Sequence, residues 1–120
     1  MKHTTPINAS EVLSLFLPSG ILDYFEITGY HIMDSCYVIN LSEQNIVPEE
    51  YSSLHLVSKG FFPEISIQDF PVRGRSVYLN VCRRRWEDKD SGTTYSRDWS
   101  LVASGTRITA EFGAFLKGLP

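Results

Sequence analysis

The sequence predicts a small α+β fold, and three observations lead to it. Short helix signals open the chain, alternating apolar and polar residues dominate from residue 26 to residue 86, and apolar residues at helical spacing close it. A length of 120 residues with 42% hydrophobic residues indicates a single domain, residues 1–120, with a core large enough to fold without disulfides or metal. We therefore expect a small antiparallel sheet with a long projecting β-hairpin, flanked by short N-terminal helices and one C-terminal helix.

The first predicted element is a short helix. Asn8 is suited to be its N-cap, with Glu11 three residues later, and residues 12–17 supply an apolar face until Pro18 ends it. After this break, residues 21–25 predict one further helical turn that packs on the same core.

The next segments favour strands. Residues 26–30 and 36–41 are rich in β-branched and aromatic side chains and predict a hairpin. A short strand follows within residues 54–61, residues 65–70 alternate, and residues 71–74 form a turn with proline and glycine.

Residues 76–86 predict the longest strand. Val77, Leu79 and Val81 fall on one face of it. Residues 88–92 are typical of a hairpin turn, and residues 93–99 are expected to return as the partner strand.

The last predicted element is a helix capped by Thr106 or Thr109. Its apolar residues recur at helical spacing, which predicts one face turned to the core. These residues are Ile108, Phe112, Phe115, Leu116 and Leu119.

Charge is unevenly distributed along the chain. Residues 1–58 contain one lysine and seven acidic residues, whereas residues 73–107 contain eight basic and four acidic residues. Seven of the eight bases are arginines, whose planar guanidinium suits phosphates and base edges, and aromatic residues are interleaved with them. A solvated hairpin whose arginines pair with adjacent acids is the alternative interpretation. The candidate DNA-binding residues are Arg73, Arg75, Arg83, Arg84, Arg85, Lys89, Arg97 and Arg107.

Three consecutive arginines at residues 83–85 cannot all lie on one face of a strand. Because a bare arginine is costly to bury, the hairpin is expected to project, with both faces wet near its tip. Replacement of Arg84 and Arg97 by alanine is then expected to change the thermal midpoint by only a few degrees.

Several classes of chemistry find no support in the sequence. His3, His31 and His55 lie in no recognised nucleophile motif, and no glycine-rich phosphate loop is present. Cys36 and Cys82 are too few and too far apart for a zinc site, and we expect two reduced, buried thiols in a cytosolic protein. No apolar run is long enough for a membrane span. We therefore expect no catalysis, no metal, no cofactor and no membrane contact.

One motif resembles a known family. The run from Gln68 to Leu79, QDFPVRGRSVYL, followed by RRRW at residues 83–86, resembles the "DLP-x-x-G-x-x-V-x-L … RRF" signature at the N-terminus of insertion-sequence transposases of the ISL-three type. The whole chain, through residues 17–25, 69–71, 95–99 and 106–109, is similar to a Bacteroidetes variant of this transposase N-terminal region. In that variant a separate downstream reading frame carries the catalytic part.

The resemblance also implies a zinc ribbon that this chain has modified. In the family, two Cys-x-x-Cys knuckles bind one zinc, and here they would fall near residues 47–51 and 87–92, which contain no cysteine. The resemblance thus implies a metal-free ribbon, in which we expect Trp86, Tyr95 and Trp99 to form an aromatic cluster that replaces the zinc.

The implied function is that of a non-catalytic transposase N-terminal region. It would bind double-stranded DNA at the terminal inverted repeats through the arginine-rich hairpin, in the bacterial cytoplasm and associated with the nucleoid. The acidic triad and helix-turn-helix of the full transposase have no counterpart in these 120 residues. The alternative is a protein-interaction module that docks onto a separately encoded catalytic transposase subunit, through its acidic N-terminal half or its last helix.

Overall fold

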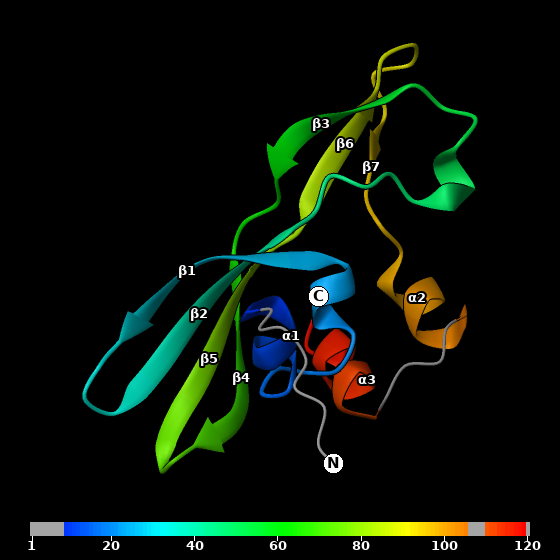
Figure 1. Ribbon diagram of the computed structural model, residues 1–120. Coiled ribbons are helices and arrows are strands. Elements are labelled where there is room, and N and C mark those ends of the chain that lie inside the picture. The colour runs from blue at the N-terminus through cyan, green and yellow to red at the C-terminus, as the bar shows by residue number, and fades with distance from the viewer. Residues whose placement is uncertain (1–8, 106–109, 120) are drawn as a thin grey trace.

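The computed structural model describes residues 9–105 and 110–119 and confirms the α+β class (Figure 1). The strands form two separate β-sheets. The first sheet has four strands in the order β1 (Phe25–Ile32), β2 (Cys36–Glu43), β5 (Arg75–Cys82) and β4 (Ile65–Val72). The second sheet has three, in the order β3 (Leu56–Phe61), β6 (Arg84–Asp88) and β7 (Thr94–Tyr95).

Short helices accompany the sheets. The predicted N-terminal helices are present as α1 (Ala9–Ser14) and the 3-10 turn η1 (Ile21–Asp23), and a second 3-10 turn, η2 (Glu49–Tyr51), precedes the second sheet. The predicted last helix is α3 (Ala110–Lys117). Its candidate caps Thr106 and Thr109, its residue Ile108, and the candidate cap Asn8 of the first helix lie outside the described residues.

One helix, α2 (Trp99–Gly105), was not predicted. Residues 93–99 were expected to form a strand, but only Thr94 and Tyr95 pair with β6. The chain turns to helix because the carboxylate of Asp98 accepts a hydrogen bond from the backbone N–H of Leu101 (3.1 Å), which satisfies a free donor of the first helical turn.

The first sheet is mixed, so the expectation of an antiparallel sheet was wrong. β2 and β5 run parallel in the register from Cys36 opposite Ser76 to Ser42 opposite Cys82. The chain leaves β2, builds β3 in the second sheet and β4 at the far edge, and only then returns beside β2. The β1–β2 and β4–β5 hairpins are antiparallel as predicted, and Arg73 and Gly74, both with positive φ, form the turn of the second one.

The predicted long strand of residues 76–86 belongs to both sheets. It is interrupted at Arg83, where the chain changes partners: β5 pairs with β2 and β4, and β6 pairs with β3 and β7. The backbone C=O of Arg83 accepts a hydrogen bond from the N–H of Phe62 (2.9 Å), which joins the two sheets at this point. The projecting part is therefore a three-stranded sheet and not a two-stranded hairpin (Figure 1).

The core lies between the first sheet and the helices. Val77, Leu79 and Val81 are buried on one face, as predicted, and Leu41 joins them from β2. Apolar side chains from the helical segments, from the turn after α1 and from the start of β1 cover this face and exclude water from it. These residues are Leu17, Ile21, Phe25, Phe112, Phe115 and Leu116.

The expected cluster of Trp86, Tyr95 and Trp99 does not form. Trp99 stacks on Phe25, with ring centroids 5.3 Å apart, and so belongs to the core of the first sheet. Trp86 is buried in the second sheet and donates a hydrogen bond from its indole N–H to the side-chain oxygen of Asn45 (3.0 Å).

The two cysteines are both free and half-buried, so the expectation that they are buried was too strong. The parallel register places Cys36 at the start and Cys82 at the end of the β2–β5 pair, six positions apart. At roughly 3.3 Å per residue this separates them by about 20 Å. A disulfide needs Cα atoms within about 7 Å, so the fold does not permit one between them.

We expect Cys82 to react more slowly with thiol reagents than an ordinary exposed cysteine. Burial raises the pKa of its thiol, and the nearby Glu64 carboxylate, 3.7 Å from its sulfur, raises it further. The reactive thiolate is therefore scarce near pH 8. Alkylation rates of Cys36→Ser protein between pH 7 and 10 would measure this pKa, and a value below that of free cysteine would contradict it.

Candidate functional site

The predicted basic residues do not form one surface. Arg73 and Arg75 lie at the β4–β5 turn at one end of the molecule, which is 53 Å along its longest axis. Arg85 and Lys89 belong to the second sheet and its tip, at the opposite end (Figure 1). The other three described members, Arg83, Arg84 and Arg97, are half-buried, and Arg107 lies outside the described residues.

A buried carboxylate joins the two sheets. Glu43 is the last residue of β2, and only 1% of its surface is exposed. One carboxylate oxygen accepts the backbone N–H of Arg84 (3.0 Å), and the other accepts the Nε–H of Arg97 (3.0 Å). The side chain of Arg97 is itself only 11% exposed, so this ion pair is largely shielded from solvent.

The pKa of Glu43 is raised, chiefly because burial disfavours its ionised form, while its bonds to Arg84 and Arg97 oppose that effect. A raised pKa means that the protonated form contributes stability below the ordinary pKa of 4.5, and that this stability is lost as pH rises through the raised pKa. At neutral pH the two arginines therefore offset a cost of burial. This is a structural role.

The guanidinium groups of Arg84 and Arg97 have further partners. Arg84 donates to the backbone C=O of Glu43 (3.1 Å) and to the hydroxyl of Ser58, and lies over the ring of Phe61. Arg97 donates to the backbone C=O of Ile46 (2.6 Å) and lies over the rings of Tyr24 and Trp99. The expectation that these two arginines are exposed was therefore wrong, because the segment from residue 43 to residue 54 covers one face of the second sheet.

The outer face of the second sheet carries both signs of charge. Arg85 is exposed but donates twice to the backbone C=O of Lys59 (3.3 and 3.1 Å), and Lys59 forms an ion pair with Glu87 (3.4 Å). At the tip, exposed Lys89 lies in a segment where Nδ1 of His55 and the carboxylate of Asp90 are 3.0 Å apart. This arrangement fits the alternative interpretation, in which bases of the hairpin pair with neighbouring acids.

The β4–β5 turn holds the other accessible bases. Arg73 is exposed, and Arg75 is half-buried with its guanidinium over the ring of Tyr37, 5.2 Å from its centroid. No ion pair involves either arginine among the residues that the structure describes. Arg73 and Arg75 therefore give this turn a small positive charge.

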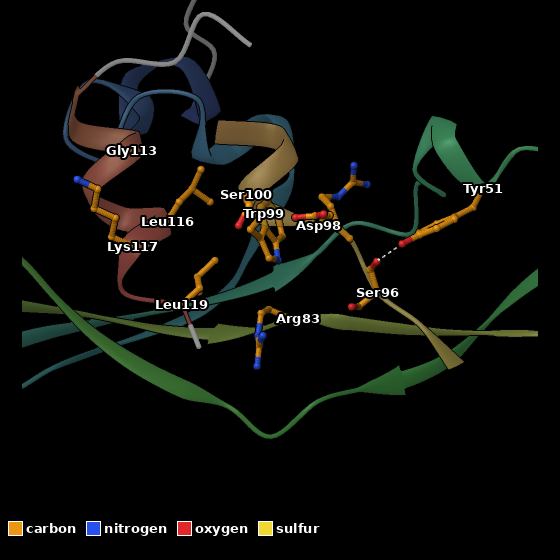
Figure 2. Close-up of a pocket in the computed structure, with 11 residues that line it drawn as sticks. Tyr51, Arg83, Ser96, Asp98, Trp99, Ser100, Gly113, Leu116, Lys117 and Leu119 are labelled. Carbon is orange, nitrogen blue, oxygen red and sulfur yellow. Dashed lines mark hydrogen bonds between the residues drawn. The ribbon is translucent and has the colours of Figure 1, made fainter. Parts of the chain in front are cut away.

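A cleft of about 820 Å³ lies between the helices and the junction of the sheets (Figure 2). Arg83 forms its floor, and Lys117 on the rim points away from Arg83. Asp98 caps α2, and the hydroxyl of Tyr51 donates to the backbone C=O of Ser96 (3.0 Å). The described lining residues include no histidine or cysteine.

The chain around the two segments where the resemblance would place zinc knuckles is held together by contacts between residues 45–55 and residues 86–95. Tyr51 packs against Tyr95, with ring centroids 5.0 Å apart, and the backbone N–H of Lys89 donates to the C=O of His55 (3.0 Å). Trp86 and Asn45 are joined by the hydrogen bond described above. Within residues 9–105 and 110–119, no three histidine, cysteine or acidic side chains are grouped for metal binding. That the purified protein contains no stoichiometric metal stays a prediction.

A large exposed apolar surface was missed by the sequence analysis. The apolar residues 12–17 were expected to face the core, but only Leu17 is buried, while Leu15 and Phe16 are 77% and 64% exposed. Phe70 on β4 is 72% exposed. The helix α1 ends at Ser14, so Leu15 and Phe16 lie in the turn that follows it. The available signal was the length of the run, since six successive apolar or small residues cannot all share one buried face of a helix.

Comparison with protein-family models, curated proteins and solved structures gives no match for this chain. No helix in the described part of the chain is both long and apolar enough to cross a membrane.

Proposed function

We propose that this chain is a non-catalytic docking module of an insertion-sequence transposase, which binds a separately encoded catalytic subunit. The observation that carries the docking role is the exposure of large apolar side chains on the turn that follows α1 and on the two edge strands β1 and β4. Soluble monomers rarely expose large apolar patches unless these bind a partner. The residues are Leu15, Phe16, Tyr30, Ile32 and Phe70. Leu15, Phe16 and Phe70 line one hollow together, whereas β1 lies at the opposite edge of the sheet from β4.

Two further observations support the proposal. Two of the arginines that were expected to contact DNA, Arg84 and Arg97, are instead bound to the buried carboxylate of Glu43. The assignment to a transposase follows from the resemblance of residues 68–86, and the packing of residues 45–55 against residues 86–95 suits a ribbon that is held by side chains in place of zinc.

The direct test is binding of the full chain to the purified catalytic protein that the downstream reading frame encodes. We expect a complex in calorimetry that changes little between 0.1 and 0.5 M salt, because apolar burial dominates it. Phe16→Ser is expected to weaken the complex, and Leu101→Ser, which alters an exposed leucine on α2, serves as the matched control. Absence of a complex at micromolar concentrations would overturn the proposal.

DNA binding is the second candidate, and the accessible bases at the β4–β5 turn favour it. Arg73 is exposed there and Arg75 is half-buried, and neither has an acidic partner among the described residues. If they contact phosphates of a terminal inverted repeat, the double variant Arg73→Ala/Arg75→Ala reduces the slope of log K against log salt by about two units. The same salt-slope measurement on the variant Arg85→Ala/Lys89→Ala tests DNA binding by the second sheet. A shallow slope that neither variant alters would exclude this candidate.

A further inference from the structure

A groove of about 330 Å³ lies between the edge strand β4 and helix α3. A smaller recess of about 90 Å³ adjoins it toward α1, and Pro18, Asp69, Phe70 and Glu111 line both. The groove is therefore continuous with the apolar residues of β4 and of the turn after α1 that the proposed function uses.

Its floor and rim are apolar. Leu79 and Phe115, both members of the core, form part of the floor, and Ile67 is half-buried beside them. Phe16 borders the recess and Phe70 borders both hollows, and both are largely exposed. An apolar floor with exposed aromatic rims gains free energy when a partner excludes water from it.

The groove also holds two carboxylates. Asp69 is half-buried on β4, and Glu111 lies in the first turn of α3. Burial raises the pKa of Asp69, and the charge of Glu111 raises it further, while the backbone N–H of Phe70 partly opposes both. Neither carboxylate forms an ion pair with a base in the part of the chain that the structure describes.

We propose that this groove binds a basic side chain, lysine or arginine, that the catalytic subunit presents between apolar residues. The long aliphatic stem of such a side chain fits the apolar floor, and its charged end reaches the two carboxylates. A cation there relieves the repulsion between Asp69 and Glu111, whereas a purely apolar occupant would desolvate Asp69 without compensation. This inference rests on the proposed docking function and names the chemistry of the partner's segment.

The experiment compares the double variant Asp69→Asn/Glu111→Gln with the matched variant Glu26→Gln/Glu49→Gln. Both remove two acidic charges, but Glu26 and Glu49 are exposed residues outside the groove. We expect binding of the catalytic subunit to weaken at least tenfold in the first variant and less than twofold in the second. The thermal midpoint of the first should stay the same or rise, because a repulsion is removed.

A peptide probe separates this inference from the proposed function. NMR titration with the acetylated, amidated peptide Leu-Leu-Arg-Leu-Leu should shift the amide signals of Phe16, Asp69, Phe70 and Glu111. The same peptide with uncharged citrulline in place of arginine should not. If the catalytic subunit binds both double variants as tightly as the native chain, the groove is not the docking site, although the docking function stands. If the subunit does not bind at all while the peptide binds here, the docking function fails and the chemistry of the groove stands.

Discussion

Replacement of Arg97 by alanine is expected to lower the free energy of unfolding by about 3–5 kcal/mol at pH 7. The change leaves the carboxylate of Glu43 buried with its backbone bond to Arg84 but without the Arg97 guanidinium 3.0 Å away. It also removes the hydrogen bond to the C=O of Ile46 and the contacts with Tyr24 and Trp99. The loss of stability should be smaller near pH 4, because a protonated Glu43 carries no charge that Arg97 must compensate.

Chemical denaturation at the two pH values measures this effect. Lys89→Ala is the control, since it removes an exposed base from the tip of the second sheet and should change stability by no more than about 0.5 kcal/mol. Addition of Glu43→Gln to the Arg97→Ala chain should restore part of the loss, because the two residues are in direct contact and their effects are coupled. A loss of less than about 1 kcal/mol at pH 7 would show that Arg97 has no structural role.

The local elements of the fold were predictable because their signals are local. Alternation placed Val77, Leu79 and Val81 on one buried face, and the glycine of residues 71–74 marked the β4–β5 turn. The parallel pairing of β2 and β5 was not predictable, because it joins segments about forty positions apart and no short pattern specifies such a pairing. For the same reason, the alternation of residues 76–86 does not indicate that the strand changes its pairing partners at Arg83.

The roles of the arginines were the largest error of the sequence analysis. A count of charges does not tell an exposed base from one that compensates a buried acid. The sequence did hold one signal, because Glu43 continues the alternation of Tyr37, Ile39 and Leu41 and so falls on the face of β2 that turns to the core. An acid at such a position predicts a buried ionic partner, and the arginines that fill this role come from residues 84 and 97.

Trp86 is the residue of the second sheet whose replacement should have the largest effect. It is fully buried, and its indole N–H donates to Asn45, in the segment that covers the inner face of the sheet. Trp86→Ala is expected to lower the free energy of unfolding by about 3–5 kcal/mol, because it leaves a cavity in the sheet. This cavity would lie close to the position where the resemblance implies a zinc ion. Trp86→Phe keeps most of the volume and loses the hydrogen bond, so a loss of about 1–3 kcal/mol is expected.

Fluorescence tests the same site independently of stability. The chain has two tryptophans, so in Trp99→Phe protein Trp86 is the only one left, and its buried ring should emit at short wavelength. A chelator such as EDTA should leave both this emission and the unfolding midpoint unchanged if packing alone holds residues 45–55 against residues 86–95. A red shift on addition of chelator, reversed by zinc, would mean that a metal and not Trp86 holds these segments together. Native stability in Trp86→Ala protein would contradict the role of the indole directly.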